Sequence, residues 1–302
     1  AKAPLERRYG ELAGDCQGAL AFMPKLPHLG AMERMPALFV GHGSPTNTFE
    51  DNRYTRIWRA LGEALPRPRA ILAISAHWYF GTSAVTAMEH PRTIHDFYGF
   101  PRHFFEFEYP APGDPDLAAM VREVARPLWV GLDEDQWGLD HGTWSVLAHM
   151  YPQADVPVLQ LSINGLRPLD YHLELGARLA PLRDEGMLIL GSGNVVHNLS
   201  TMRRDLLDLG HDWGIRFDKA AIAQFERDPG DALDLLDHPD FAMAVPTPEH
   251  FIPALYIAGL AATEGSTLKA FGEGHALGAV SMTSYALGLS DAAIGAIEAA
   301  GA

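Results

Sequence analysis

The sequence predicts an α/β protein, and specifically a single-domain α/β/α sandwich with a largely parallel or mixed central sheet. The first observation is that short apolar runs alternate with segments whose apolar residues recur every three or four positions. Such alternation of strands and helices is typical of α/β sandwiches. The second is that most of the apolar runs lack the in–out alternation of a half-exposed strand, which favours a sheet covered by helices on both faces.

The strands are predicted at the apolar runs of residues 37–40 (ALFV), 70–75 (AILAIS), 83–88 (SAVTAM), 128–132 (LWVGL), 156–162 (VPVLQLS), 187–192 (MLILGS) and 278–284 (GAVSMTS). A helix over 54–65 is predicted by apolar residues at helical spacing, namely Tyr54, Ile57, Trp58, Leu61 and Leu65. Asp114 and Pro115 predict the start of another helix, with a capping side chain and a proline at the first position. Further helices are predicted near residues 168–183, 213–227 and 249–263.

The amino-acid composition limits the kinds of partner that the protein is expected to bind. The 302 residues carry a formal net charge of -15, which argues against a nucleic-acid or anionic-membrane surface. No 18-residue apolar run predicts a membrane helix. Cys16, the single cysteine, excludes an internal disulfide and a Cys-rich zinc site, and it fits a reducing cytoplasm. We therefore expect a cytoplasmic protein without a nucleic-acid or membrane partner; the sequence does not predict its oligomeric state.

The chain divides into two parts of unequal length. Residues 1–34 are mixed in pattern and are expected to form an extended arm or a tail. Residues 35–302 contain no repeat and no convincing linker, so one domain is expected there. The long segment 91–115 is rich in proline, glycine and aromatic residues, and it is interpreted as a functional loop or a lid.

The positions of the histidines are the main indication of function in this sequence. His42, His77 and His197 each follow a predicted strand. The carboxyl ends of parallel strands share one edge of the sheet, and ligands bind there in open α/β folds. His141 and His250 lie in turn-rich segments beside helix starts. Because imidazole is a common metal ligand, a cluster without cysteine suits Zn(II) or non-haem Fe(II).

Each of these histidines also has a purely structural interpretation, since a histidine after a strand is more often a hydrogen-bonded loop residue than a ligand. The glycines on either side of His42, at positions 41 and 43, favour the functional interpretation, because they would let the backbone bend and leave room for a bound atom. His95 is an intermediate case that could line a pocket or hydrogen-bond within its own loop. Neither a GxSxG elbow nor an HExxH motif is present, which disfavours serine hydrolases of that type and zincins.

Seven motifs follow one another from about residue 35 to the C-terminus: GHGSP, SAHW, TIHDFYGFP, YPAPG, GLDHGTW, GSGNVVHNL and PTPEHFIP. Together they resemble those of the class III extradiol ring-cleavage dioxygenases, and most closely the 4,5-DOPA dioxygenase-type branch. The resemblance implies an α/β catalytic domain at residues 35–302 that uses one divalent metal and O2 to open the ring of a catechol. The metal would be Fe(II) for ring cleavage or Zn(II) in the protein as isolated.

The resemblance also implies roles for particular residues. His42, His77 and His250 fall on metal-ligand positions. His197 falls near the metal, either as a fourth ligand or as an acid/base residue, and His141 matches a second active-site histidine that moves protons or holds substrate. Glu249 adjoins His250 and is the alternative ligand, since better-known members bind Fe(II) through two histidines and a glutamate.

Two other functions remain open from the residues alone. Histidine ligands suit a zinc-dependent hydrolase with a metal-bound water equally well. A non-catalytic binding protein on the same fold is the second alternative, because a fold does not dictate a function.

Overall fold

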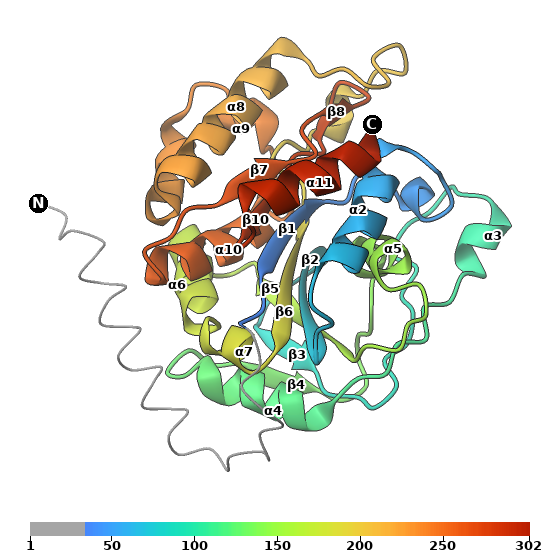
Figure 1. Cartoon of the computed structure of the whole chain (residues 1–302), viewed down its shortest axis with the longest axis vertical. Helices are drawn as coiled ribbons and strands as arrows, with labels where there is room; N and C mark the ends of the chain where they lie inside the picture. Colours follow the sequence, from blue (N-terminus) through green and yellow to red (C-terminus); the bar gives the residue numbers. More distant parts are fainter. Residues whose placement is uncertain (1–33) are drawn as a thin grey trace, which may run out of the picture.

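A central eight-stranded sheet organises the computed structural model, which describes residues 34–302 (Figure 1). The strand order is β4-β3-β5-β2-β6-β1-β10-β7. The strands are β1 (Ala37–Gly41), β2 (Ala70–Phe80), β3 (Ala84–Thr86), β4 (Gly131–Asp133), β5 (Val158–Asn164), β6 (Met187–Gly193), β7 (Lys269–Phe271) and β10 (Ser284–Leu287), and β8 (His275–Ala276) pairs with β9 (Val280–Ser281) outside this sheet. The predicted arm, residues 1–34, lies outside the described residues except for Arg34.

The four middle strands, β5, β2, β6 and β1, run parallel to one another. Antiparallel pairs join β3 to β5 on one side and β10 to β1 on the other. The sheet is therefore mixed with a parallel centre, which confirms the predicted class. The parallel centre matters for function because it brings the carboxyl ends of four strands to one edge.

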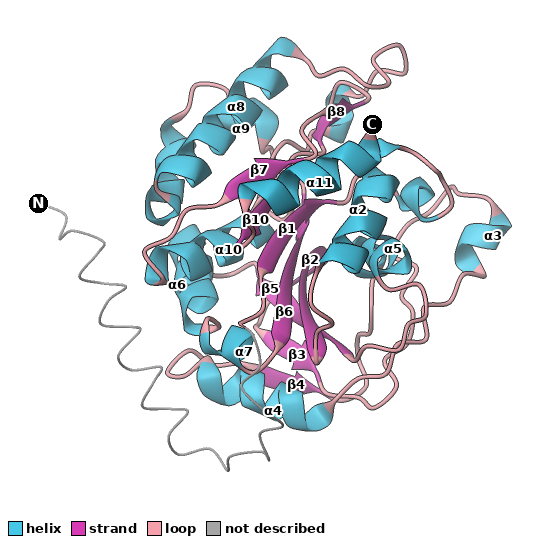
Figure 2. Cartoon of the chain, in the orientation of Figure 1, coloured by secondary structure: helices cyan, strands magenta, loops and turns pink. Residues whose placement is uncertain are grey.

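Helices cover both faces of the sheet (Figure 2). They are α2 (Arg53–Ala64), α3 (Arg102–Phe105), α4 (Pro115–Val124), α5 (His141–Met150), α6 (Leu169–Arg178), α7 (Pro181–Asp184), α8 (Asp212–Arg227), α9 (Phe241–Ala244), α10 (Ile252–Thr263) and α11 (Asp291–Gly301). Short 3-10 helices occur at Pro45–Thr48, Leu199–Thr201 and Pro229–Asp237. One layer contains α4, α6, α8 and α10, and the other contains α2, α5 and α11.

Successive residues of the buried strands face opposite layers. In β1, Ala37 and Phe39 belong to the apolar core under α6 and α10, whereas Leu38 and Val40 belong to the core under α2 and α5. Side chains alternate along a strand, so a strand buried on both faces must be apolar at every position. This explains why the sequence shows uninterrupted apolar runs.

Three predicted elements need correction. The run at 278–284 is not one strand: it gives β9 and the first residue of β10, because Leu277 and Gly278 turn through positive φ and the chain leaves the small sheet after Ser281. The predicted helix 168–183 is split into α6 and α7, and Pro181 starts the second piece. The strand predicted at 70–75 continues to Phe80 through an irregularity between Ile74 and Tyr79.

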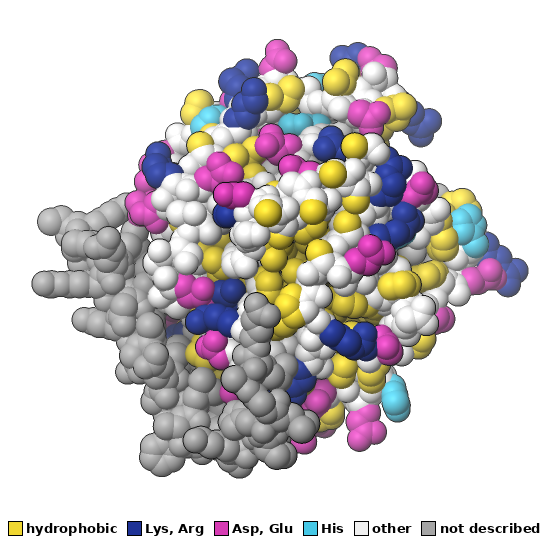
Figure 3. Space-filling model, in the orientation of Figure 1, with side chains coloured by type: hydrophobic (Ala, Val, Ile, Leu, Met, Phe, Trp, Pro, Cys, Tyr) yellow, Lys and Arg dark blue, Asp and Glu magenta, His cyan; other side chains and the backbone are white. Residues whose placement is uncertain are grey.

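The remaining predicted strands and helices overlap observed elements, although β4 begins only at Gly131. The C-terminal helix α11 was not predicted. None of the helices described between residues 34 and 302 has the length and apolarity needed to cross a bilayer. On the face drawn in Figure 3, acidic and basic side chains are interspersed and no large basic patch is seen.

Helices α6 and α10 pack so closely that glycine is required at their contact. A Cβ atom at Gly259 would lie 2.1 Å from the carbonyl oxygen of Leu173, and one at Gly176 would lie 2.2 Å from that of Tyr256. We expect Gly259→Ala to lower the free energy of unfolding by about 1–3 kcal/mol, the usual cost of overpacking. Urea or thermal unfolding measures the change.

The matched control is Gly295→Ala in α11, where an added Cβ meets nothing within 4 Å. Because alanine is the better helix former, that variant should be as stable as the original protein or up to about 1 kcal/mol more stable. Equal unfolding midpoints for the two variants would contradict the assigned α6–α10 contact.

Candidate metal centre

The carboxyl ends of the parallel strands bring together histidines that are far apart in the sequence. His42 directly follows β1, and Ser192 lies in β6 beside it. The strand register pairs Ser192 with Val40 of β1 on one side and with Ser75 of β2 on the other. His77 in β2 therefore lies at the same level of the sheet as His42 does just past the end of β1. His77 lies inside the extended β2 and not after its end, which corrects the sequence-based placement.

Three of the rings form a nearly equilateral triangle. Ring centroids are 5.1 Å apart for His42 and His77, 5.1 Å for His77 and His250, and 5.5 Å for His42 and His250. Three imidazoles that bind one ion at about 2.1 Å with near-tetrahedral angles have centroids about 5 Å apart. The spacing of these three rings thus fits a single divalent ion, and the chemistry of the three donors fits Fe(II) or Zn(II).

Hydrogen bonding fixes which nitrogen of His42 carries the proton. The Ser192 hydroxyl lies 2.5 Å from the carbonyl oxygen of Gly142, which can only accept, so the hydroxyl proton is donated there. The His42 Nδ1 atom lies 3.0 Å from the same hydroxyl oxygen. That oxygen has no further proton to give, so Nδ1 of His42 must donate to it. The Nε2 atom of His42 is left as an acceptor.

His77 is held in the same tautomer by a carboxylate. Its Nδ1 lies 2.8 Å from Oδ2 of Asp96. Burial raises the pKa of Asp96, but the hydrogen bonds from His141 and His77 outweigh it and hold the pKa well below its ordinary value. The carboxylate is therefore ionised, and its close ion-pair contact favours the form of His77 with a proton on Nδ1, which leaves Nε2 for a metal ion or a second proton.

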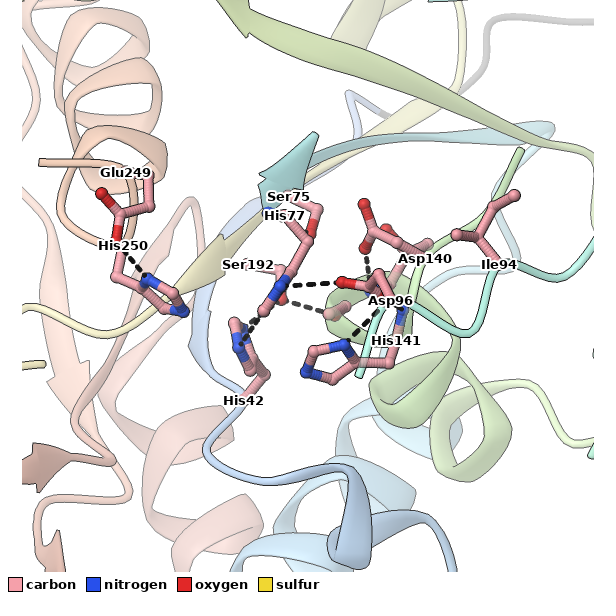
Figure 4. Close-up of polar contacts among 12 residues, drawn as sticks. His42, Ser75, His77, Ile94, Asp96, Asp140, His141, Ser192, Glu249 and His250 are labelled. Atoms are coloured by element: carbon pink, nitrogen blue, oxygen red, sulfur yellow. Dashed lines mark hydrogen bonds and ion pairs between the residues drawn. The ribbon is translucent and has the colours of Figure 1, made fainter. Parts of the chain in front are cut away.

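The two free Nε2 atoms of His42 and His77 face each other at 3.1 Å (Figure 4). Two acceptors at that distance repel unless a cation lies between or beside them. A proton or a metal ion would serve. The arrangement matches the pattern in which a metal-binding imidazole donates its other nitrogen to a carboxylate or a hydroxyl group.

His250 completes the triangle in a similar way. Its Nδ1 lies 3.2 Å from Oε1 of Glu249, and the Thr247 hydroxyl donates to the same carboxylate oxygen at 2.8 Å. Figure 4 shows the ring of His250 turned toward His42 and His77 while Glu249 lies behind it. The neighbouring carboxylate thus contacts the back of the imidazole, which favours His250 over Glu249 as the ligand at this position.

Glycines allow the backbone segments to meet at the site. A Cβ on Gly193 would lie 2.2 Å from the His250 carbonyl oxygen, and one on Gly142 would lie 2.4 Å from Oγ of Ser75. Gly43 has a φ of +67° and forms the turn after His42. Gly41 has a different structural role from the one expected. A Cβ atom there would lie only 2.6 Å from the carbonyl oxygen of Met282. The glycine permits a close strand contact and does not leave room for an ion.

The other two predicted histidines lie against this triangle. The His197 ring stacks on that of His250 with centroids 3.5 Å apart and planes 9° apart. His141 begins α5, and its ring centroid is 3.9 Å from that of His77. Two imidazoles at right angles on one ion need a centroid separation of about 4.5 Å. Both ring contacts are shorter, which favours roles beside the ion for His197 and His141. Each of the two also belongs to a group of three possible donors whose atoms lie within 4.8 Å of one another, namely His42, His77 and His141, and His197, Glu249 and His250.

Burial keeps most of these rings neutral. It lowers the pKa of His42 and of His250 well below the ordinary value, and the neighbouring histidines lower both further. Burial also lowers the pKa of His141 and of His197 to about 4. Burial lowers that of His77 too, but the hydrogen bond and charge of Asp96 outweigh it and leave the pKa raised. Neutral imidazole is the form that binds a metal.

Sequence reasoning missed the polar residues that support the histidines. Asp96 lies in the TIHDFYGFP motif beside His95, which instead hydrogen-bonds the Phe107 carbonyl oxygen at 2.9 Å. Asp140 caps α5 by accepting from the Thr143 backbone N–H at 3.3 Å and also accepts from the side-chain amide of Gln160. Burial raises the pKa of Asp140 to about 6. Asp96 follows His95 and Asp140 precedes His141 in the sequence, and this adjacency was the signal that could have identified them as supporting residues.

Comparisons with known proteins show which proteins this chain resembles. Residues 25–288 match the family model described as the catalytic LigB subunit of aromatic ring-opening dioxygenase. The chain is 47% identical to the Escherichia coli K12 protein named 4,5-DOPA dioxygenase extradiol, covering 84% of this chain and 95% of that protein. A Beta vulgaris protein of the same name is 35% identical, with 82% and 94% covered. A crystal structure of an uncharacterised Escherichia coli K12 protein superimposes with a TM-score of 0.74 at 43% identity, covering 84% of this chain and all of that chain.

We expect His42→Ala to lose the divalent ion, because removing one corner of the triangle leaves two ligands and an empty buried space. His90→Ala, at an exposed histidine, is the matched control and should bind one equivalent. Metal content after dialysis against Zn(II), measured by atomic emission, separates the two. One full equivalent in His42→Ala would rule out the proposed ligand set.

Proposed function

The chain belongs to the family of the catalytic LigB subunits of aromatic ring-opening dioxygenases, and we propose that it opens the ring of a DOPA-like catechol beside the diol, with Fe(II) held by His42, His77 and His250. The observation that supports this most directly is the pair of acceptor nitrogens of His42 and His77 facing each other at 3.1 Å. The substrate class follows from the names of the relatives, several of which are called 4,5-DOPA dioxygenase extradiol.

Residues 35–302 act in this proposal as one catalytic domain. The chemistry that Fe(II) supplies when bound is chelation of both catechol oxygens together with transfer of electron density from the ring to O2. The protein itself has to supply the ligands, remove protons from the catechol and keep water away. A reducing cytoplasm, which the single cysteine favours, would keep iron in the ferrous state.

His141 is the proposed base. Its Nδ1 is 2.9 Å from Oδ1 of Asp96, to which it donates, so Nε2 carries the free electron pair. The lowered pKa means that the ring is neutral at pH 7 and able to accept a proton from a catechol hydroxyl. His141 is the first residue of α5, and this position holds its ring close to that of His77, one of the three proposed ligands.

His197 is proposed as a second acid/base group. It follows β6, and its backbone N–H donates to the carbonyl oxygen of Ala244 at 2.9 Å. Its ring covers one face of the His250 ring, whereas His141 lies against His77, so the two groups contact different corners of the triangle. Protons could thus be removed at one corner and returned at another during ring opening.

Aromatic residues of the 91–115 segment form the wall beside His141. The Phe97 ring stands edge-on to His141 with centroids 5.5 Å apart, and it also contacts Trp144 at 6.0 Å. Phe107 packs against Trp144 at 5.0 Å. Tyr98 of the same segment is 93% exposed and does not contribute to this wall. The wall is apolar and therefore limits water near the base.

Anaerobic loading with Fe(II), followed by O2 and a panel of substituted catechols, tests the proposed activity. We expect O2 consumption with a product that is heavier than the substrate by two oxygen atoms, found by mass spectrometry. The zinc form should not consume O2. Hydrolytic activity of the zinc form without O2 uptake by the iron form would support a zinc hydrolase instead. Absence of any divalent-metal binding would support a non-catalytic binding protein.

His141→Gln should lower kcat by roughly 10²–10⁴, the usual contribution of general acid–base catalysis. Metal content should stay at one equivalent, since His141 is not among the proposed ligands. Steady-state O2 uptake and metal analysis of the same preparation provide both values. A variant that keeps full kcat would remove His141 from the proton-transfer role.

A further inference from the structure

Asp96 connects the two functional parts of the site. Its Oδ2 lies 2.8 Å from Nδ1 of His77, a proposed ligand, and its Oδ1 lies 2.9 Å from Nδ1 of His141, the proposed base. Oδ1 also accepts from the backbone N–H of His141 at 3.1 Å. One carboxylate thus holds both rings in the tautomer that presents Nε2 (Figure 4).

The segment that carries Asp96 is fixed on both sides of it. The Ile94 N–H donates to the Leu139 carbonyl oxygen at 2.7 Å, and the Trp144 indole donates to the Ile94 carbonyl oxygen at 3.0 Å. His95 hydrogen-bonds the Phe107 carbonyl oxygen across the same loop. The side chain of Asp96 is only 12% exposed. The carboxylate is therefore preorganised and does not depend on closure of a flexible lid.

We propose that Asp96 is a positioning residue that simultaneously sets the metal affinity through His77 and the proton transfer through His141. The proposal rests on the function proposed above. An ionised carboxylate can accept from both Nδ1 atoms at once. The amide of asparagine has one accepting oxygen and one donating nitrogen, so one of the two rings would face a donor. That ring has to turn or to move its proton to Nε2, where it can neither bind a metal nor accept a proton.

The experiment compares Asp96→Asn and Asp96→Ala with Glu108→Gln, which removes an exposed carboxylate from the same loop. The first readout does not need activity: affinity for Zn(II), measured by competition with a chromophoric chelator. Loss of an outer carboxylate partner of a ligand histidine typically weakens metal binding 10–100-fold. We expect that loss for both Asp96 variants and less than a twofold change for Glu108→Gln. Circular dichroism of the metal-free variants confirms that each is folded.

The second readout is kcat and KM at saturating Fe(II). Asp96→Asn should lower kcat at least about tenfold, within the usual range for acid–base effects, with little change in KM. In a His141→Gln background the same substitution should lower kcat much less, because its partner is already absent. Its effect on Zn(II) affinity should persist there in full. A merely structural residue would lower kcat by the same factor in both backgrounds.

The outcomes separate the two proposals. Folded Asp96 variants with Zn(II) affinity within twofold of the unmodified protein would overturn the role at His77. Equal kcat losses with and without His141 would overturn the role at His141. If the unmodified Fe(II) protein cleaves no catechol, the proposed function fails, and the Zn(II) measurement still decides whether Asp96 supports the metal ligand.

Discussion

The contact between the Nε2 atoms of His42 and His77, which face each other at 3.1 Å, governs the rest of the site. Both Nδ1 atoms are engaged elsewhere, so the contact needs a cation, either a proton or a metal ion, between or beside the two nitrogens. The Ser192 hydroxyl oxygen accepts a hydrogen bond from Nδ1 of His42, and the Asp96 carboxylate pairs with Nδ1 of His77. Burial and the neighbouring histidines lower the pKa of His42 and of His250, whereas Asp96 raises that of His77, so a proton at this contact belongs to His77 until a metal ion replaces it. Such a centre is built to receive a metal ion.

The fold supplies this contact through strand register and close backbone contacts. The adjacent parallel strands β1 and β6 end at the same level, and β2 passes beside them at Ser75 and continues to Phe80, so three chain segments lie side by side at this edge. Gly193 admits the backbone of His250, and Gly142 admits the first turn of α5 beside β2. Side chains at either glycine would push a histidine away. The two helical layers, packed on both faces, leave the strands no freedom to shift register.

Much of this arrangement could be predicted from the sequence. Uninterrupted apolar runs predicted a sheet that is buried on both faces, and the alternation of strands and helices predicted an α/β sandwich. The five site histidines were identified from strand ends, turns and ordered motifs. What could not be predicted was the support around them. Asp96 looks like a loop aspartate in an aromatic segment, and only tertiary contacts bury it against two imidazoles. The continuation of β2 past Ser75 depends on pairing with β5, which the local sequence does not encode.

Anomalous diffraction from crystals of the Zn(II)-loaded protein, recorded on both sides of the metal absorption edge, locates the ion. We expect one peak about 2.1 Å from the Nε2 atoms of His42, His77 and His250, with Glu249 and Asp96 contacting the opposite nitrogens of their histidines. A peak bound by Glu249 and His197 without His42, or a fully loaded protein with no peak at this sheet edge, would contradict this expectation.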